Sequence, residues 1–539
     1  MKNQQVLLRY FTLLFVLFVS GLQMGISQQI QWPEGKMMAL SLSFDDARES
    51  HPTVGLPLFD ELDARVTFYV VPNAMRKYQD EWKAIVAAGH ELGNHTLVHP
   101  CSGNFPWARD KALENYNLAA MRAELQEASG QIEEMTGVKP VSFAYPCGQT
   151  YVGRGEQTKS YVPLISDLFV TGRDWLNEAP NSPVYADLAQ LQAISMDGKD
   201  FKEDIKPILK RAANNEDWVV LAGHEIGEDG FQTTRVDMLK QLIAYAKDPQ
   251  YGIWLAPVGE IASYIEDQRA SLQRSLSQEL TLAATFDDGV KADYALGDTK
   301  LFTAAAYNEL KTQKAGLRYP AAEISEGTGV HGDALAFPTK AKPVAYYQAA
   351  ENVDYQKENW SGTISLWLSL DPDKELAPGY TDPIQITDVG YNDAALWVDF
   401  SDKNPRSFRM GVYGDLSVWN PENIPPDKNP AFNERLLPAT DLPFGKGIWT
   451  HVVVTYERLN TNGGMAKFYI NGKPQGERKI KEPFTWDVEK AKIFLGLNYI
   501  GLLDEVALFK RSLSKAEVQM LYHLPGGLNT LLKQQKAGK

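Results

Sequence analysis

Basic residues are scarce relative to acidic ones in this chain. Lysine and arginine together number 54 against 68 aspartates and glutamates, which gives a formal net charge of -14. Nucleic acid is therefore excluded as an expected partner, because phosphate binding needs a basic face. A neutral or cationic substrate fits this charge better. Beyond the N-terminus the sequence also lacks any segment apolar enough to cross a membrane.

The N-terminal segment, residues 1–27, has the pattern of a secretory signal peptide. Lys2 and Arg9 give it a positive start, Phe11 to Val19 form a short apolar run, and small residues precede Gln28. This pattern predicts export to the periplasm or the extracellular space, with an uncleaved membrane anchor as the alternative. No cysteine follows the apolar run, which excludes a lipidation site of the lipoprotein kind.

Only two cysteines are present, Cys101 and Cys147. In an exported protein such a pair favours a disulfide, because oxidising compartments preserve these bonds. Two buried free thiols are the alternative.

Residues 28–268 alternate short apolar runs with helical patterns, and this order predicts a parallel sheet, closed or open. The expected strands are Met38–Phe44, Val66–Val71, a short run near His90, Val141–Tyr145, Leu168–Thr171, Ala193–Met196, Val219–Ala222 and Ile253–Ala256. The expected helices include Glu81–Ala88, Lys111–Thr136, Phe201–Ala213 and Val236–Ala246.

The pattern changes near residue 280. We assign residues 269–280 to a linker, 281–526 to a second domain and 527–539 to a C-terminal tail. Short strands with turn signals dominate the second domain, which predicts a β-sandwich or jelly roll. Asn471-Gly472 predicts a hairpin turn. Expected strands there include Thr363–Leu370, Ala395–Phe400, His451–Tyr456, Met465–Ile470 and Lys492–Leu497.

In the first domain, polar candidate residues recur where the predicted strands end. Active sites of α/β barrels are built from those strand ends, so the recurrence predicts a site at this edge of the sheet. The candidates are Asp45-Asp46, His95 and His99, Pro146-Cys147-Gly148, Arg173-Asp174-Trp175 and His224.

Two histidines four residues apart, His95 and His99, can bind one metal ion, and a carboxylate from a neighbouring strand completes the ligand set. Such a site keeps one position open for water, as catalytic zinc requires, and the ion lowers the pKa of that water. A second carboxylate can take the proton, and a separate histidine can protonate a leaving group. The pattern predicts a hydrolase with one divalent ion, with Zn²⁺ preferred.

Five segments, taken in order, resemble the motifs of the polysaccharide deacetylase family, also called carbohydrate esterase family 4. The resemblance covers roughly residues 36–268. It implies a distorted (β/α) barrel of seven or eight strands, and removal of acetyl groups from N-acetylglucosamine polymers or from xylan. The segments are Ser43–Asp46, His95–His99, Ala144–Gly148, Asp174-Trp175 and Ala222–His224.

The resemblance also implies residue roles. Asp45 would be the general base and His224 the general acid, and the backbone N–H of Cys147 would help hold the oxyanion. The metal ligands would be Asp46, His95 and His99. The residues expected to line the substrate pocket are Tyr145, Pro146, Trp175 and Ala222.

Two positions depart from the family pattern. The family's third motif carries an arginine that pairs with the base, and Ala144 stands at that position. Arg173, at the end of the next predicted strand, is expected to supply the guanidinium instead. Ala222 replaces a leucine, which would enlarge the acetyl pocket. Cys101 and Cys147 lie beside or within motifs, so a disulfide would join two loops at the mouth of the site.

A second aspartate pair, Asp287-Asp288, repeats the first motif, but no His-x3-His follows it. We interpret this pair as turn or calcium-binding residues. Most of residues 281–525 resembles laminin G-like, concanavalin A-like jelly rolls, on the segments Gly501–Val506, Trp449–Val454 and Phe468–Gly472. That resemblance implies carbohydrate or protein binding, often with Ca²⁺. A spacer without a ligand is the alternative.

The sequence therefore predicts an exported, metal-dependent deacetylase of an N-acetylglucosamine-type polysaccharide, with an accessory glycan-binding domain. Two alternatives remain open. One is an esterase that removes O-acetyl groups from a xylan-type glycan on the same fold. The other is a non-catalytic carbohydrate-binding protein, which the missing third-motif arginine would favour.

Overall fold

The computed structural model describes residues 30–537, so the predicted signal peptide at 1–27 lies outside the described residues. The chain divides into two compact units, one from Ile30 to Ser271 and one that begins at Leu272. Helix α9 (Val258–Glu279) contains this boundary, and the stretch 269–280 expected as a linker is therefore almost entirely helical. Across residues 30–537, no helix is long and apolar enough to span a membrane.

The first unit is the distorted barrel that the sequence predicts. Its parallel strands are ordered β7-β4-β3-β2-β1-β9-β8, and β12 pairs with the start of β1. A parallel bridge between Arg173 and Leu191 joins β7 to the segment that leads into β8, so backbone pairing continues around the ring. The strands are β1 (Met38–Phe44), β2 (Thr67–Val70), β3 (Glu91–Asn94), β4 (Ser142–Ala144), β7 (Thr171–Arg173), β8 (Ile194–Ser195), β9 (Trp218–Gly223) and β12 (Ile253–Leu255).

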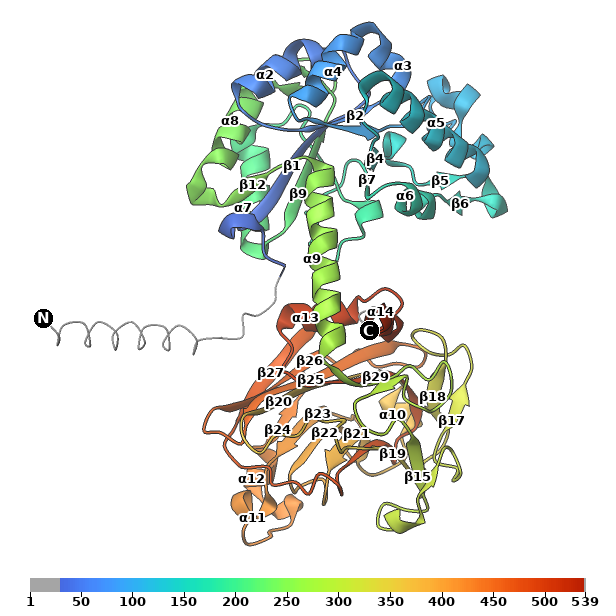
Figure 1. Ribbon diagram of the computed structural model, residues 1–539, viewed down its shortest axis with the longest axis vertical. Coiled ribbons are helices and arrows are strands. Elements are labelled where there is room, and N and C mark those ends of the chain that lie inside the picture. The colour runs from blue at the N-terminus through green and yellow to red at the C-terminus, as the bar shows by residue number, and fades with distance from the viewer. Residues whose placement is uncertain (1–29, 538–539) are drawn as a thin grey trace, which may run out of the picture. The chain divides into compact units, whose positions relative to one another are not determined.

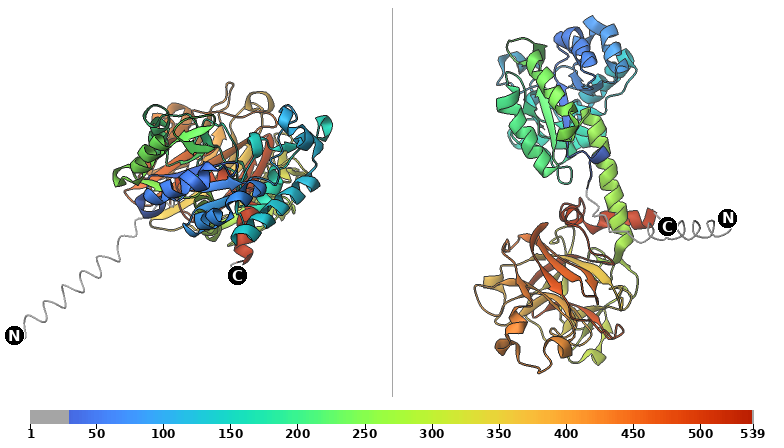
Figure 2. Two further views of the ribbon diagram at one scale, coloured as in Figure 1. Left: turned by 90° about the horizontal axis from the view of Figure 1, so that it is seen from above. Right: turned by 90° about the vertical axis from the view of Figure 1, so that its left-hand side faces the viewer.

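Helices surround these strands in the views of Figures 1 and 2. The amphipathic pattern of each helix buries its apolar side against the strands, as Leu239 and Leu242 do in α8. The helices are α2 (Leu56–Glu61), α3 (Pro72–Met75), α4 (Gln79–Ala87), α5 (Leu118–Thr136), α6 (Val162–Leu168), α7 (Lys206–Asn215) and α8 (Val236–Lys247). Two short pairs, β5 (Tyr151–Val152) with β6 (Lys159–Ser160) and β10 (Glu225–Gly227) with β11 (Thr233–Arg235), complete the unit.

Strand β1 shows why the barrel is stable. Leu40, Leu42 and Phe44 pack in the large apolar cluster with the helices. The alternate residues point to the other face, where Ser41 Oγ donates to the carbonyl of Ala256 and Ser43 Oγ donates to the carbonyl of Leu221. Strand residues alternate between faces, so one face supplies the core and the other fills the barrel interior with satisfied small polar groups.

Among the element boundaries that differ from the sequence prediction, two have a clear physical cause. The helix expected from Lys111 begins only at Leu118, because the Asn117 side chain caps it by accepting from the Ala120 N–H. The strand expected at Leu168–Thr171 begins only at Thr171, because Leu168 ends helix α6. Pro163 in the first turn of α6 favours that helix start.

The second unit is the predicted jelly-roll sandwich of two antiparallel sheets. One sheet has the order β14-β13-β29-β20-β25-β26-β27, with β18 beside β29 and β17 beside β18. The other has the order β16-β15-β19-β28-β21-β22-β23-β24. Apolar side chains from both sheets form one core cluster. Asn471 and Gly472 both have positive φ between β26 and β27, which confirms the predicted hairpin turn.

The strands of the second unit are β13 (Leu280–Ala284), β14 (Tyr294–Ala295), β15 (Leu301–Ala304), β16 (Lys314–Ala315), β17 (Glu323–Ser325), β18 (Ala334–Phe337), β19 (Val344–Gln348), β20 (Trp360–Ser369), β21 (Thr381–Thr387), β22 (Ala395–Phe400), β23 (Phe408–Tyr413), β24 (Leu436–Pro438), β25 (Trp449–Leu459), β26 (Gly464–Ile470), β27 (Lys473–Ile480), β28 (Lys492–Leu497) and β29 (Gly501–Phe509). Its helices are α10 (Pro372–Glu375), α11 (Leu416–Trp419), α12 (Pro430–Asn433), α13 (Lys515–Tyr522) and α14 (Leu528–Ala537).

The C-terminal stretch 527–539, taken from sequence as a tail, contains helix α14. Leu528, Leu531 and Leu532 are buried, so this helix packs on the second unit through an apolar side. Its N-terminus is also anchored, because the Leu528 N–H donates to a carboxylate oxygen of Glu505.

Candidate active site

The aspartate pair lies directly beyond the end of β1. The Asp45 N–H donates to the Gly223 carbonyl at 2.9 Å, which extends the pairing of β1 with β9 by one residue. Asp46 and Ala47 then have φ of 75° and 53°. Such left-handed conformations are strained for residues other than glycine and gather at functional sites. The turn sends the two neighbouring carboxylates in different directions.

His95 and His99 lie in a tight loop after β3. His95 Nδ1 lies 2.8 Å from the Ala144 carbonyl, which leaves Nε2 to face Asp46. The Asn94 side chain accepts from the Thr96 N–H, and the His99 N–H donates to Thr96 Oγ1 at 3.0 Å. These side-chain bonds hold the loop in shape, so the two imidazoles are positioned before any ligand arrives.

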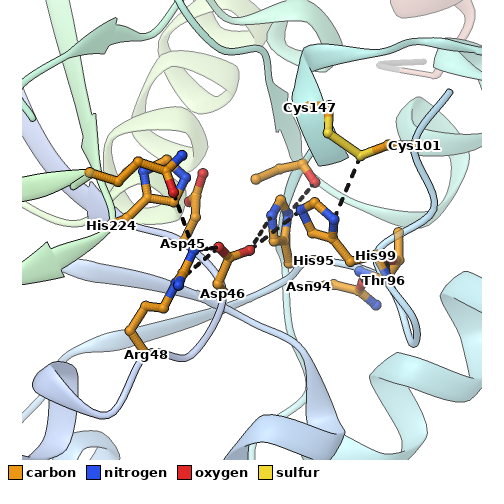
Figure 3. A network of polar contacts seen from close by, with 12 residues as sticks. Asp45, Asp46, Arg48, Asn94, His95, Thr96, His99, Cys101, Cys147 and His224 are labelled. Atoms are coloured by element: carbon orange, nitrogen blue, oxygen red, sulfur yellow. Dashed lines mark hydrogen bonds and ion pairs between the residues drawn. A yellow bond between two sulfur atoms is a disulfide. The ribbon is translucent and has the colours of Figure 1, made fainter. Parts of the chain in front are cut away.

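Asp46, His95 and His99 form a metal-binding arrangement (Figure 3). Asp46 Oδ1 lies 3.5 Å from His95 Nε2 and 3.4 Å from His99 Nε2. Two ligand atoms at about 2.1 Å from a tetrahedral ion are about 3.4 Å apart, so these separations suit a shared cation. The sequence-predicted ligand set is therefore brought together, and its donors fit a divalent ion such as Zn²⁺.

The protonation of these groups also suits metal binding. Burial opposes ionisation of Asp46, but the hydrogen bond and charge of His95, with the charges of His99 and Arg48, hold the pKa of Asp46 far below its usual range. Burial, with the charge of His95, lowers the pKa of His99 to about 4. An ionised carboxylate and a neutral imidazole are the forms that coordinate metals.

Arg48 binds the other oxygen of Asp46. Its Nε and Nη2 donate to Asp46 Oδ2 at 3.1 and 2.8 Å (Figure 3). This contact leaves Oδ1 directed at the two histidines. Arg48 was not predicted as a site residue, because a single arginine two residues after an aspartate is an ordinary surface pattern.

Arg173 supplies the guanidinium that Ala144 lacks. It forms an ion pair with Asp45, and both side chains are buried. Its Nη1 also donates to the Asp174 carbonyl at 3.0 Å, and its guanidinium lies 4.6 Å from the centre of the Tyr69 ring. Ala144 and Arg173 are paired in register on β4 and β7. The guanidinium therefore comes from the strand next to the one that carries the arginine position of the third family motif.

Asp197 holds His224 in place, and this aspartate was not predicted from the sequence. Asp197 Oδ2 lies 2.7 Å from His224 Nδ1, and Asp197 Oδ1 accepts from the His224 N–H. Burial alone would lower the pKa of His224, but the bond to Asp197 and the charges of Asp45, Asp197 and Asp46 together raise it. Asp197 directly follows the predicted strand Ala193–Met196, so its strand-end position was the available signal.

The fourth family motif was assigned to Asp174 and Trp175, but only Trp175 contacts His224 in the structure. The Asp174 carboxylate accepts from the Trp175 N–H at 2.8 Å, whereas the carboxylate beside His224 is that of Asp197. The Trp175 ring lies edge-on to His224, with ring centres 4.8 Å apart. Trp175 is therefore at the site, as expected.

Three of the four residues expected to contact substrate are buried. Tyr145 is 1% exposed, and its hydroxyl donates to the Ala189 carbonyl within an aromatic cluster. Ala222 is fully buried in the apolar cluster behind β9. Pro146 is also buried, in a turn with Cys147, whose φ is 54°.

A disulfide joins Cys101 to Cys147, with the two Cα atoms 6.1 Å apart. Cys101 Sγ lies 3.6 Å from His99 Nδ1, directly behind the metal-binding loop (Figure 3). The bond ties the loop after His99 to the turn that follows β4.

The loop after Cys101 carries an exposed aromatic pair that no motif signals. Phe105 and Trp107 stack at 5.5 Å, and Trp107 is 56% exposed. The Trp107 ring centre lies 5.9 Å from that of His99. An exposed tryptophan beside a polar site offers an apolar surface on which a sugar ring can pack.

Asp287, from the second aspartate pair, belongs to an acidic cluster in the second unit. Asp287 accepts from the Asp333 N–H and from Asn529 Nδ2, and Asp504 accepts from the Val330 N–H. Glu505 is buried, and within residues 30–537 its Oε1 has no hydrogen-bond partner. Burial raises the pKa of Asp504 to about 8 and that of Glu505 to about 9, and nearby carboxylates contribute to both shifts.

Comparison with known proteins gives a match in each unit. Residues 33–160 match the family model for polysaccharide deacetylase, and residues 345–519 match that of the concanavalin A-like lectin/glucanases superfamily.

Individual relatives are distant. A gellan lyase from a Bacillus species is 21% identical over 330 residues, which are 56% of this chain and 12% of that protein. An uncharacterized protein of Bacillus subtilis is 31% identical over 93 residues, which are 17% of this chain and 26% of that protein. The chain thus spans a small part of these curated relatives.

Among solved structures, the Xyl-CE4 domain of a multidomain xylanase from the hindgut metagenome of Trinervitermes trinervoides aligns with a TM-score of 0.28 at 15% identity. The alignment covers 43% of this chain and 91% of that one. From the two family matches and the barrel and sandwich described above, the chain joins a domain of the polysaccharide deacetylase family to a domain of the concanavalin A-like superfamily.

Proposed function

We propose that the first unit is a metal-dependent hydrolase that removes acetyl groups from a polysaccharide, with N-acetyl groups as its main target. The proposal rests on one observation. Asp46, His95 and His99 converge beside two further polar pairs, Asp45 with Arg173 and His224 with Asp197, at the same ends of the barrel strands.

The metal ligands in this proposal are Asp46, His95 and His99. A divalent ion bound there would supply Lewis-acid activation of water and of an acyl carbonyl. Arg48 and the Ala144 carbonyl would keep Asp46 and His95 oriented toward that position. Preorganised ligands of this kind reduce the reorganisation needed when an ion binds.

Asp45 and His224 take the proton-transfer roles. Asp45 accepts the proton of the attacking water, and Arg173 fixes the direction of its carboxylate. His224 donates a proton to the departing nitrogen or oxygen, and Asp197 holds its Nδ1 so that the other ring nitrogen faces the substrate. The backbone N–H of Cys147 remains the proposed oxyanion donor, and Trp175 the proposed wall of the acetyl pocket.

The raised pKa of His224 favours amide over ester hydrolysis. An amine is a poor leaving group, so an N-deacetylase depends on a general acid, and a raised pKa keeps His224 protonated to higher pH than an ordinary histidine. An O-acetyl esterase on the same barrel needs that acid less. The Arg173–Asp45 ion pair supports the catalytic hypothesis over the non-catalytic one, because it gives Asp45 a guanidinium partner that Ala144 cannot provide.

Acetate release tests this proposal. The full chain is incubated with acetylated chitooligosaccharide and with acetylated xylan, before and after chelation and after Zn²⁺ is restored. We expect acetate from chitooligosaccharide, loss on chelation and recovery with metal. Release from xylan alone would identify an O-acetyl esterase. A metal-loaded protein that releases acetate from neither substrate would refute the deacetylase.

For the second unit we propose a glycan-binding role and a structural Ca²⁺ site. The partnerless Glu505 Oε1 supports Glu505 as a ligand. Because Asp287, Asp504 and Glu505 do not form a convergent set of three ligand atoms, backbone carbonyl groups would have to complete the site. Hard carboxylate oxygens are the ligands that Ca²⁺ prefers.

We further propose that the protein is exported. The Cys101–Cys147 disulfide supports an oxidising compartment.

A further inference from the structure

The second unit contains a pocket of about 760 Å³ on the outward face of the sheet that includes β21, β22 and β23. Small-molecule sites commonly measure about 300–1,000 Å³, so the volume suits a ligand. Loops close the pocket on two sides, one with Tyr307 and one with residues 426–433. None of the candidate active-site residues lines it.

Alternation along the strands explains how this face is built. On β22, Leu396, Val398 and Phe400 point into the sandwich core, and Trp397 and Asp399 point to the pocket. The outward face of a sandwich sheet is usually solvated. Here Trp397 and Asp399 are only 3% and 4% exposed, so the face is enclosed rather than open to water.

Aromatic rings line the pocket. Tyr380 and Tyr391 are 54% and 43% exposed, which is unusual for such large side chains. The Trp397 ring lies over Gly411, where a Cβ atom would come within 2.3 Å of the ring. Gly411 therefore allows the indole to lie flat on the sheet. Flat aromatic surfaces pack well on the C–H faces of sugar rings.

Polar groups converge among these rings. Arg409 Nε donates to Asp399 Oδ1 at 2.9 Å, and its Nη2 donates to Oδ2. Gln385 Nε2 donates to the Tyr307 hydroxyl at 2.7 Å. These pairs fix the donors and acceptors in place, as in sites where a few polar groups orient a ligand.

Asp382 lines the same pocket and has no internal partner. Within residues 30–537 its carboxyl group makes no hydrogen bond, although the side chain is only partly exposed. Burial, with the charge of Asp399, raises the pKa of Asp382 well above its usual range. A carboxyl group in this state can both donate and accept, which is what a sugar hydroxyl requires.

Charge narrows the ligand class. Asp399 neutralises Arg409, and the remaining charged residues of the lining, Lys342, Asp382 and Asp427, carry no excess of positive charge. The lining as a whole therefore has no net positive charge to attract a uronic acid or sulfated chain, whereas an uncharged sugar needs only the hydrogen bonds and rings described.

We propose that this pocket binds an uncharged oligosaccharide, stacked on Tyr380 and Tyr391 and hydrogen-bonded by Gln385 and Asp382. The inference rests on the proposed glycan-binding role of the second unit and gives that role its residues. It does not depend on acetyl chemistry, because every residue named belongs to the second unit.

Calorimetric titration of the full chain tests the pocket. An Asp45→Asn background prevents turnover of acetylated ligands. The probes are oligosaccharides of N-acetylglucosamine, glucose and xylose, with an oligogalacturonate as the charged comparison. We expect at least one uncharged probe to bind. Tyr380→Ala and Gln385→Ala should each raise its Kd by about tenfold, the effect of losing one central contact.

Tyr319→Ala is the matched control, because Tyr319 is a partly buried tyrosine of the same unit outside the pocket, and its loss should leave Kd unchanged. The inference is overturned if no uncharged probe binds, if only oligogalacturonate binds, or if Kd is the same in the pocket variants. The Tyr380→Ala variant of an otherwise native chain should release acetate at the wild-type rate. This measurement distinguishes glycan binding by the second unit from deacetylation by the first. Failure of wild-type acetate release, with probe binding intact, would refute only the deacetylase.

Discussion

Arg173 and Asp45 form an ion pair between strands that are not neighbours. Arg173 ends β7 and Asp45 follows β1, and β4, β3 and β2 separate these strands in the sheet. The pair therefore crosses the barrel interior. A buried pair of this kind is costly to break, because the remaining charge loses its partner in a medium that solvates it poorly.

Arg173→Ala should abolish most acetate release and destabilise the protein by about 3–5 kcal/mol, the usual cost of breaking a buried ion pair. Urea denaturation and kcat/KM measure the two effects. Because Ala144 pairs in register with Arg173, the double variant Arg173→Ala, Ala144→Arg should restore part of both. A double variant as inactive and as unstable as the single one would contradict the proposed relocation of the guanidinium.

The ligand and proton-transfer residues should separate in metal content. His95→Ala should lose both bound metal and activity, since it removes one of three donors. Asp45→Asn and His224→Ala should lose about a hundredfold or more in kcat, the scale of general acid–base catalysis, and retain the metal. Elemental analysis of each purified variant, beside its acetate-release rate, checks this. Metal loss in all three variants would instead indicate general collapse of the site.

Asp197→Asn should narrow the pH range of activity on the alkaline side. The Asp197 bond and charge raise the pKa of His224, and the proposed acid works only when protonated, so activity declines as pH rises through that pKa. Removal of the charge lowers the pKa of His224 and moves the decline to lower pH. Thr234→Val is the control, because it removes a hydrogen bond to Asp197 but keeps its charge. An unchanged alkaline limb in Asp197→Asn would rule out this role.

Trp107→Ala should raise KM for long acetylated chains and leave kcat on a short one nearly unchanged. The ring is exposed beside His99, so it can hold a neighbouring sugar without touching the scissile bond. We expect about a tenfold increase in KM, equivalent to one lost aromatic contact. The melting temperature of the Trp107→Ala variant should equal that of wild type. Equal effects on short and long chains would place Trp107 outside the binding surface.

Ca²⁺ should raise the melting temperature of the second unit, and more at pH 8 than at pH 5. The folded-state pKa values of Asp504 and Glu505, about 8 and 9, lie above their ordinary values of 3.8 and 4.5. Without a cation, the stability linked to their protonated forms is complete at low pH and is lost as pH rises toward 9. A bound cation offsets that loss. Calorimetry of wild type and Glu505→Gln with added Ca²⁺ measures it, and an identical response of the two proteins would exclude Glu505 as a ligand.

Sequence patterns predicted the strongly apolar elements well. The bounds of β1, β22 and β28 agree with the prediction, because uninterrupted or alternating apolar runs allow little choice. The run Leu168–Thr171 fits either a helix end or a strand, and only the packing of α6 decides between them.

Within the site, the candidate metal ligands His95 and His99 were predictable because their spacing places both on one loop. Asp197 was missed because its partner His224 is distant in sequence and no local pattern links them. The burial of Tyr145 and Ala222 was not predicted, because motif membership does not reveal how deeply a side chain is packed.

The position of the disulfide has a thermodynamic consequence. Cys101 lies two residues from His99 and contacts its ring, so the covalent crosslink and the proposed coordination bond would constrain the same short loop. Each bond is then easier to keep when the other is present. An ion held at this loop would shield the crosslink from reductants, and an intact crosslink would slow escape of the ion.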